Sequence, residues 1–503
     1  MFRHLFIQIY LGRFDRALQC LKSGENVDNY GVKKPRKKPK RHKFGVISFY
    51  TMGNIQRFFG TTREINFNSP QNEFSQYWES FLESELGKIY RAIPWHNLVK
   101  SFKINEFKKG PMRLFSPQGM LALMFLKSYM DCSDKKLIEY LNGSIDFQMF
   151  CGIYLGTNRI KNYKIVSHIR CYLSHRLDIK AHQEVLAGYW KPYMSQTNIM
   201  LEDATCYETS MRYPTNVKLL WECVKWSYGQ MKCMCKFLKI RTPRTKYLKH
   251  ENNYRNYSRK RKKSVKERTV LTRSLLHILN KLIGLLEEIE DSNKRKLELP
   301  KEYYERMKVI KVVINQQRQM FHTGQSVPDR IVSIAKSYIR PIVRGKETKK
   351  VEFGAKVNMV QFDGINFIER LDFNAFHEGI RLKASIRYGR ELFGLLTHVS
   401  ADDIYATNTN RKYCTSQKIT TNFKRKGRAG KYEQQRLIIA SELRKERATR
   451  MEGSFGTEKE HYGLKRIKAR NEKTETLWIF FGVHTANAVR IAKRLANEHQ
   501  KAA

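Results

Sequence analysis

Three carboxylates stand at positions from which they could act together. Asp203 and Asp402 each follow an apolar, strand-like run and precede a small or polar turn. Glu452 lies at the end of a helix-like stretch and is followed by two nearby glycines. Three carboxylates brought to one point repel one another unless cations lie between them. Two Mg²⁺ ions about 3.5–4 Å apart would balance this charge and hold the attacking and leaving oxygens of an in-line phosphoryl transfer.

The overall charge indicates what such a site would act on. The chain has 503 residues, with 95 Lys and Arg against 47 Asp and Glu, which gives a formal charge of +48. A positive charge of this size repels itself unless a polyanion neutralises it. Nucleic acid is the first candidate, and an anionic membrane surface is the second. Among 47 acids, three such positions can also arise by chance, as two strand-end acids and one helix acid in a surface ion pair.

Two classes of protein are disfavoured by the sequence. We expect no membrane span, because no run of about 20 apolar residues occurs, and no signal peptide, because the apolar Leu5–Gly12 is short and lacks a small-residue cleavage site.

Nine cysteines without a pairing frame favour a reducing cytoplasm. Cys233 and Cys235 form the tightest pair, but no second pair stands at metal spacing, so we expect thiols there and not a zinc site.

Residues 1–45 are expected to form a basic, disordered arm. Lys33–Lys43 contains eight Lys or Arg in eleven residues, together with two prolines, and cannot bury apolar surface. An arm that contacts DNA and a solvated tail without a role are both compatible with this composition.

Residues 46–190 are expected to form an all-α region. Ser116 and Ser133 each precede a helical pattern as a cap, which predicts two short helices joined by about three residues. This arrangement is that of a helix-turn-helix, although any helical hairpin has the same pattern. Lys135 and Lys136 on the second helix are therefore candidate DNA contacts.

One further helix is predicted over Ser167–Leu186. His168, His175 and His182 recur there every seven residues, which is the spacing of one helix face. Metal ligation by these three histidines is the disfavoured alternative.

Residues 218–345 are expected to be a helical, basic insertion. Apolar residues alternate steps of three and four from Leu271 to Ile289 and again from Tyr303 to Ile314, which predicts a helical hairpin. Before it, Arg255–Arg268 holds eight Lys or Arg in fourteen residues around a tyrosine, a pattern that suits a phosphate track. An exposed, solvated loop explains the run equally well. The candidate DNA contacts in this run are Arg259, Lys260, Arg261, Lys262 and Lys263.

Period-two patterns begin after residue 346. Residues 350–373 alternate apolar and polar positions and carry Gly354 and Asp363-Gly364 as turn or bulge signals, which predicts two antiparallel strands. Leu392–Tyr405 predicts another strand that ends in Asp402 and Asp403. The acid-bearing domain would therefore consist of residues 195–217 and 346–503, in an α/β fold.

The order of several motifs resembles bacterial insertion-sequence DDE transposases. The resemblance covers roughly residues 74–488 and rests on these stretches: "LALMFLKSYMDCSDKKLIEYLNGSIDFQMFCGI" from Leu121, "DATCYETSMRYPTNVKLL" from Asp203, "RIVSIAKSYIRPIVRGKETKKVEFGAKVNM" from Arg330, "ADDIYATNTNRKYCTSQKI" from Ala401, and "RMEGSFGTEKEHYGLKRIKARNEKTETLW" from Arg450. The resemblance implies an RNase H-like catalytic domain that a helical insertion interrupts and an N-terminal DNA-binding region precedes.

The resemblance also assigns roles to particular residues. It implies that Asp203, Asp402 and Glu452 are the catalytic metal ligands, and it selects Asp402 over Asp403 because the family's acid follows the alanine directly. Two positions depart from the family pattern. Ala448 stands where an Arg usually lies four residues before the Glu, and Asn216 replaces the Asp that follows Tyr-Pro-Thr.

These inferences predict a transposase that cuts double-stranded DNA at its element's ends and joins them to a target, with two Mg²⁺ or Mn²⁺ ions as cofactors. Lys459 and Arg466 lie seven and fourteen residues after Glu452, so they would share its face if the helix continues, and they could hold phosphates there. We expect the chain to act in the cytoplasm on chromosomal DNA, without a membrane, and as a homo-oligomer assembled on DNA. A DNA-binding protein without catalysis and a hydrolytic nuclease of the same fold are the alternatives.

Overall fold

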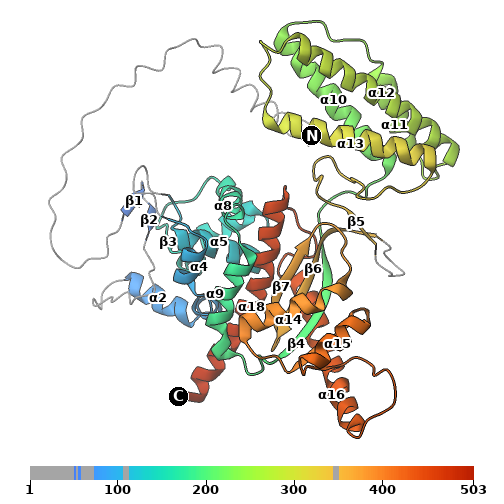
Figure 1. Ribbon diagram of the computed structural model, residues 1–503. Helices are drawn as coiled ribbons and strands as arrows, with labels where there is room; N and C mark the ends of the chain where they lie inside the picture. Colours follow the sequence, from blue (N-terminus) through green and yellow to red (C-terminus); the bar gives the residue numbers. More distant parts are fainter. Residues whose placement is uncertain (1–49, 53–54, 58–72, 106–112, 344–350, 503) are drawn as a thin grey trace. The chain divides into compact units, whose positions relative to one another are not determined.

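The structure is a computed structural model that describes residues 50–52, 55–57, 73–105, 113–343 and 351–502 (Figure 1). The described residues all belong to one compact unit of the chain. The basic arm predicted over residues 1–45 lies outside them. The architecture is mixed α/β, with a small three-stranded sheet, a six-stranded sheet and helices.

The six-stranded sheet is built around β4 (Ile199–Glu208). This strand pairs antiparallel with β6 (Val351–Phe362) on one side and parallel with β8 (His398–Ala401) on the other. The outer strands are β7 (Ile365–Asp372) and β5 (Pro341–Val343), both antiparallel to β6, and β9 (Thr420–Thr421), parallel to β8. Most residues of β4 and β6 are buried, so other parts of the chain cover both faces of the sheet's centre.

The hairpin of β6 and β7 confirms the two predicted antiparallel strands. Asp363 and Gly364 form the connecting turn with φ angles of 47° and 79°, as the Asp-Gly pair predicts. Gly354 has another role, because it lies inside β6. A Cβ atom there would come within 2.1 Å of the Tyr207 carbonyl oxygen, so glycine permits the close approach of β6 to β4.

The first part of the described chain is mostly helical. Its elements are β1 (Tyr50–Met52), β2 (Ile55–Arg57), α2 (Glu73–Glu83), α3 (Glu85–Arg91), α4 (Trp95–Ser101), α5 (Pro117–Met130), α6 (Asp134–Gly143), α7 (Ile145–Phe150), β3 (Ile153–Tyr154), α8 (Lys164–Ser174), α9 (Ile179–Trp190) and the 3₁₀ turn η1 (Lys191–Tyr193). The predicted caps are confirmed. Ser116 Oγ accepts from Gly119 N at 2.9 Å, and Ser133 Oγ accepts from Lys136 N at 3.2 Å.

The single helix predicted over Ser167–Leu186 is wrong. The helix α8 ends at Ser174, and Asp178 caps the next helix, α9, by accepting from Ala181 N at 3.1 Å. An Asp is a preferred N-cap, so Asp178 marks the start of a new helix. The seven-residue spacing of the histidines predicted one continuous helix instead. His168 and His175 are exposed whereas His182 is buried, so the three do not form one face.

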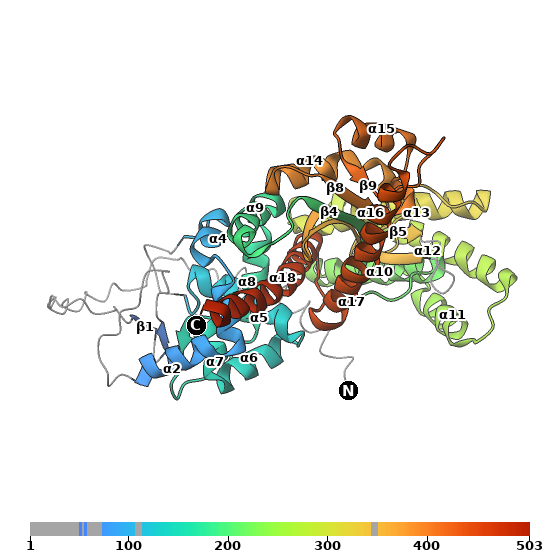
Figure 2. The ribbon, with the colours of Figure 1, turned by 90° about the horizontal axis from the view of Figure 1, so that it is seen from below.

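The C-terminal helix α18 (Glu472–Ala502) joins the N-terminal helices to the sheet. It packs against α3, α5, α8 and β7, and Figures 1 and 2 show it running alongside α5. Phe481 lies edge-on to Phe125 of α5, with ring centroids 5.0 Å apart. One apolar core therefore spans residues from α2 to α18.

Four helices between β4 and β5 have an apolar core of their own. They are α10 (Asn216–Leu238), α11 (Tyr247–Arg259), α12 (Val265–Ser292) and α13 (Lys301–Thr323). The predicted hairpin is confirmed as α12 and α13, whose periodic apolar residues are buried or partly buried against α10 and each other. By length and apolar composition α12 could also cross a membrane, but this is weak support for a span because a helix in a bundle core meets the same criteria.

The remaining elements follow β7. They are the 3₁₀ turn η2 (Glu378–Ile380), α14 (Leu382–Phe393), the 3₁₀ turn η3 (Asp403–Tyr405), α15 (Asn408–Ser416), α16 (Glu433–Glu446), the π-helical turn η4 (Arg447–Met451) and α17 (Glu452–His461). The strand predicted over Leu392–Tyr405 is shorter than expected, because its first two residues end α14 and only His398–Ala401 form β8.

Candidate active site

The parallel pairing of β4 and β8 places two of the predicted acids next to each other. Glu202 of β4 pairs with Ala401, the last residue of β8. Asp203 and Asp402 are therefore each the first residue beyond the paired part of two neighbouring parallel strands. Asp203 does not end its own strand as predicted, since β4 continues to Glu208 and stays paired with β6.

The third acid comes from the helical path of α16, η4 and α17. Glu452 is the first residue of α17, directly after the π turn, and this turn contacts β4. Figure 2 shows α16 and α17 following one another in one continuous path. The structure therefore brings an acid from the last part of the chain to the two strand acids.

One guanidinium contacts all three acids. Arg447 Nη1 lies 2.7 Å from Asp203 Oδ2 and 3.6 Å from Glu452 Oε1, and Arg447 Nη2 lies 3.7 Å from Asp402 Oδ1. The side chains of Arg447 and Asp203 are 16% and 17% exposed, whereas those of Asp402 and Glu452 are 55% and 57% exposed. Arg447 and Asp203 thus form a largely buried pair, while Asp402 and Glu452 are exposed to solvent.

The π turn explains how Arg447 reaches these acids. Arg447 precedes Glu452 by five residues, and residues five apart in an α-helix lie about 140° apart around its axis. A π turn adds one residue per turn and returns position i+5 to the same face. The residue four positions before Glu452 is Ala448, and the guanidinium comes from the residue that precedes it. Arg450 points elsewhere, to Asp363 at 3.5 Å and Glu446 at 2.8 Å.

Burial and charge act in opposite directions on Asp203. Burial raises its pKa to about 6, and the nearby Arg447 guanidinium offsets part of this rise by stabilising the charged form. Asp203 Oδ1 also accepts from the Ala204 N–H at 2.8 Å. The innermost acid is thus held by one cation and one backbone donor.

The face of β4 that carries Asp203 also contacts α17. Strand residues two apart share a face, and Lys459 Nζ donates to Thr205 Oγ1 at 2.9 Å while the Tyr207 hydroxyl donates to Glu458. Burial raises the pKa of Glu458. These contacts fix α17, and with it Glu452, against β4.

Lys459 and Arg466 differ in their placement. Lys459 is on α17 beside the acid cluster's strand, whereas Arg466 lies beyond the end of the helix at His461. The predicted shared helix face is therefore wrong for Arg466. Its Nη2 donates to the Met211 carbonyl oxygen at 3.2 Å.

The opposite face of β4 carries a buried acid that the sequence reasoning missed. Glu202 is fully buried, and burial raises its pKa to about 8. Its Oε1 accepts from Asn358 and Ser385, while Oε2 has no hydrogen-bond partner in the described part of the chain. A signal existed, because Glu202 directly follows the apolar run Ile199–Leu201 and Asn358 lies between Val357 and Met359.

The donor set matches the predicted cofactor in chemical type. Three carboxylates offer the oxygen ligands that Mg²⁺ and Mn²⁺ prefer, and a guanidinium already lies among them as a cation. As the side chains stand, no group of three or more His, Cys, Asp or Glu among the described residues is close enough to hold one metal ion. Metal binding by this triad would therefore require Arg447 to move away from the carboxylates and the three carboxylates to move closer together.

Two groups of candidate DNA contacts lie away from the acids, and both are exposed. Lys135 and Lys136 on α6 have side chains that are 72% and 51% exposed, and both pair with Glu139. The second group is at the junction of α11 and α12, and all of its members are exposed: Arg259, Lys260, Arg261, Lys262 and Lys263. The Arg255–Arg268 run is thus partly helical, with only residues 260–264 between the two helices.

Comparison with known proteins gives one result that bears on function. Residues 76–171 match a family model described as Transposase domain (DUF772). No curated protein and no solved structure matches the chain. The match runs from within α2 to within α8 and supports a transposase-related function for the protein.

Proposed function

We propose that the protein is a DDE transposase that cleaves DNA at the ends of its element and transfers the freed strands to a target. The observation that carries this proposal is the convergence of Asp203, Asp402 and Glu452 on one guanidinium. The transposase-domain match over residues 76–171 supports the same class of function independently, because it lies outside all three acids.

An RNase H-like fold is part of the proposal. Across the sheet the strands follow the order β7, β6, β4, β8 and β9. The three strands that come first in the chain therefore lie in reverse order, and the last two follow beyond β4. The pairs β4–β6 and β6–β7 are antiparallel, whereas β8 is parallel to β4 and β9 is parallel to β8. This order supports an RNase H-like domain with the α10–α13 bundle inserted after its first strand.

The chain's own residues would perform distinct tasks in the reaction. Asp203 and Asp402, side by side at the end of the β4–β8 pair, would hold cations between them, and Glu452 would complete the set from α17. Two bound Mg²⁺ or Mn²⁺ ions would supply the charge that lowers the pKa of the attacking water or 3′-hydroxyl. Lys459 would hold a phosphate of the DNA beside Thr205. Arg447, once displaced from the acids, would remain close enough to neutralise the charge that develops on the phosphate.

The DNA itself would be bound by basic segments away from the acids. Lys135 and Lys136 on α6 would contact the element's ends, and the exposed group from Arg259 to Lys263 would contact phosphates without reading bases. The +48 charge supports binding to a polyanion. We further propose that the protein assembles as a homo-oligomer on DNA, in the cytoplasm and on the chromosome.

The proposal is tested by isosteric substitution of the acids. Asp203→Asn, Asp402→Asn and Glu452→Gln should each abolish Mg²⁺-dependent cleavage of a duplex that carries the element's end, while binding to that duplex is retained. Asp403→Asn is the matched control, because it changes the adjacent acid, and its effect should be smaller. Full cleavage by any of the three variants would remove that acid from the site.

The same assay separates the alternatives. If the wild-type protein binds the duplex but does not cut it with Mg²⁺ or Mn²⁺, the protein is a DNA-binding protein without catalysis. The contact of Arg447 with all three acids gives this alternative a structural basis. If cutting occurs without joining to a second duplex, the protein is a hydrolytic nuclease.

A further inference from the structure

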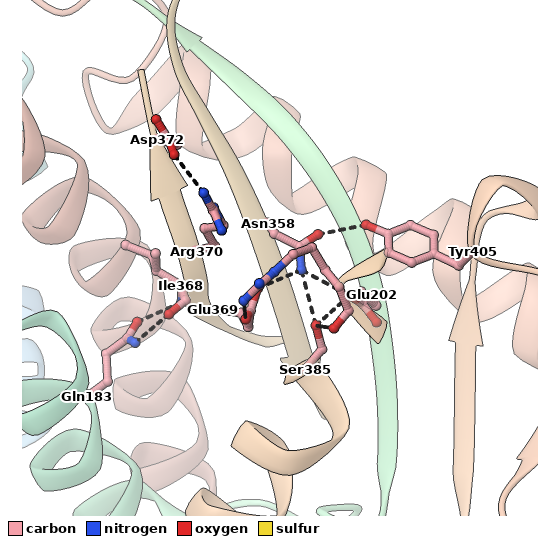
Figure 3. Close-up of polar contacts among 10 residues, drawn as sticks. Gln183, Glu202, Asn358, Ile368, Glu369, Arg370, Asp372, Ser385 and Tyr405 are labelled. Carbon is pink, nitrogen blue, oxygen red and sulfur yellow. Dashed lines mark hydrogen bonds and ion pairs between the residues drawn. The ribbon is translucent and has the colours of Figure 1, made fainter. Parts of the chain in front are cut away.

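A buried polar network surrounds Asn358 in the middle of β6 (Figure 3). The Asn358 Nδ2 group donates to Glu202 Oε1 at 2.9 Å and to Glu369 Oε2 at 3.1 Å. Asn358 Oδ1 accepts from the Tyr405 hydroxyl at 2.6 Å. The network thus connects β4, β6, β7 and the end of η3 through one side chain.

The partners of Asn358 define which way its amide faces. The amide NH₂ group can only donate, and it lies against two carboxylates and, at 3.2 Å, the Ser385 hydroxyl oxygen, whereas the carbonyl oxygen accepts from the Tyr405 hydroxyl. The reverse orientation would place an acceptor against Glu202 and Glu369. The Ser385 hydroxyl reinforces the arrangement by donating to the same Glu202 oxygen at 2.5 Å, and Arg381 pairs with Glu369. The Oδ1 atom is therefore fixed in the direction of Tyr405.

Tyr405 ties this network to the turn that carries Asp402. Asp402 immediately precedes η3, and its Oδ1 accepts from the Asp403 N–H at 2.8 Å. The backbone N–H of Tyr405, the last residue of η3, donates to the Asp402 carbonyl oxygen at 3.0 Å. The Tyr405 side chain is fully buried, so the exposed Asp402 sits on a short turn with a buried anchor.

The other end of the network lies beside Asp203. Glu202 and Asp203 are consecutive in β4 and point to opposite faces of the sheet. Glu202, which accepts a hydrogen bond from the Asn358 amide, is therefore the chain neighbour of the innermost acid. In the antiparallel register Ala204 pairs with Asn358, which makes Glu202 and Asn358 diagonal neighbours on one face. The network therefore touches the chain next to Asp203 and the turn next to Asp402.

We propose that Asn358 and Tyr405 are positioning residues that set the place of Asp402 relative to Asp203. This inference rests on the proposed function for its catalytic meaning, because the spacing of these two acids matters only if they hold cations together. The supports of metal ligands typically change metal affinity by roughly 10–100-fold when they are lost. A polar network that served the core alone would stabilise the fold without affecting Asp402 more than other surface turns.

The test is a pair of matched hydroxyl deletions. Tyr405→Phe removes the donor to Asn358 and keeps the ring. Tyr388→Phe is the control, because Tyr388 is also buried and its hydroxyl accepts from a side-chain amide, that of Gln183, at 2.6 Å. The other hydrogen-bond partners of Gln183 are Ile368 and His484, and neither is one of the two acids. Hydrogen–deuterium exchange of the backbone over residues 402–407 reports the order of the turn, and Mn²⁺ titration followed by electron paramagnetic resonance reports ligand placement.

The two readouts distinguish the inference from the proposed function. Tyr405→Phe should speed exchange over residues 402–407 and weaken Mn²⁺ binding roughly tenfold, and Tyr388→Phe should do neither. If Tyr405→Phe leaves exchange in that segment unchanged, or alters it no more than the control does, the inference is overturned. If wild-type Mn²⁺ binding is absent or insensitive to Asp203→Asn, the proposed function fails, while the exchange result still decides whether Tyr405 orders the turn.

Discussion

Arg447 Nη1 lies 2.7 Å from Asp203 Oδ2, at the point where β4 emerges from its pairing with β8. Both side chains are largely buried, so this ion pair is less screened than a surface pair. The same guanidinium lies within 4 Å of the other two acids. A cation that enters the cluster must therefore compete with a charge that the chain itself provides.

Replacing Arg447 should change metal affinity and metal-free stability in opposite directions. Arg447→Gln removes the competing charge, so we expect Mn²⁺ to bind roughly tenfold more tightly, which corresponds to the loss of one charge-assisted hydrogen bond. Without metal, Asp203 loses its charged partner, and the free energy of unfolding should fall by about 1–3 kcal/mol. Mn²⁺ titration and urea unfolding measure the two effects.

Arg450→Gln is the control for Arg447, because it removes a guanidinium from the same π turn. Its partners are Glu446 and Asp363, not the three acids. It should leave Mn²⁺ affinity unchanged. Equal metal affinity in both variants and the wild type would show that Arg447 does not occupy the cation position.

Lys459 and Arg466 should differ in their effect on cleavage. Lys459→Met removes a charge that lies beside Thr205, on the strand face that carries Asp203. The loss of one charge-assisted contact to phosphate, about 1.5–3 kcal/mol, should slow cleavage roughly tenfold to a hundredfold. Arg466→Met removes an exposed charge outside α17 and should slow it far less. Single-turnover cleavage at saturating Mg²⁺ measures both, and an equal loss would contradict the separate roles.

The exposed group between α11 and α12 should control the salt dependence of DNA binding. Changing Arg259, Lys260, Arg261, Lys262 and Lys263 to Gln should reduce the slope of log affinity against log salt by up to about 4–5, at about 0.9 per phosphate contact. The loss should be similar for element-end and scrambled duplexes, because phosphate contacts carry no base information. The control replaces five exposed cations of the same bundle: Lys294, Arg295, Lys296, Lys301 and Lys308. An equal change in slope for the control would mean that general charge, and not this segment, determines binding.

A contrasting result is expected in the same titrations for Lys135 and Lys136. If α6 reads the element's ends, changing both to Gln should reduce the preference for the end sequence more than the overall affinity. Lys161 and Lys164, which are exposed in the same helical region, are the matched control pair. Unchanged end preference would move recognition to another segment.

Two buried histidines should make the fold sensitive to acid. Burial lowers the pKa of His484 to about 3 and that of His182 to about 4, so both are neutral in the folded chain. The unfolded chain takes up these protons near pH 6.5, and the stability that the neutral histidines provide is therefore present above pH 6.5 and lost as the pH falls below it. At pH 5 the loss is about 2 kcal/mol for each histidine.

His484→Gln isolates this effect, since glutamine has no proton to gain in this range. His484 Nε2 contacts Gln183 Oε1 at 3.1 Å, and its environment joins α18 to α9. The difference in Tm between wild type and variant should shrink, or reverse sign, as the pH falls from 7.5 to 5. Parallel pH profiles for the two proteins would contradict a depressed pKa for His484.

Features set by neighbouring residues could be predicted from the sequence. Ser116 and Ser133 cap helices because a hydroxyl before a helical run can reach an amide three residues on, and Asp363-Gly364 turns because both residues tolerate positive φ. The spacing of apolar residues likewise predicted α12 and α13. The prediction of a single helix over Ser167–Leu186 was wrong, because Asp178 caps a second helix within that range although the histidine spacing continues through it.

The arrangement of the acids was decided by tertiary structure. Asp203 and Asp402 are brought together by a parallel strand pairing across the whole insertion, and no local pattern specifies that register. Arg447 reaches them only because η4 is a π turn, which moves a residue five positions before Glu452 onto its face. The network of Glu202, Asn358 and Tyr405 depends on contacts between three separate segments. The sequence by itself determined which residue types were present and the helices and turns that local contacts form, while packing of distant strands decided which of those residues face one another.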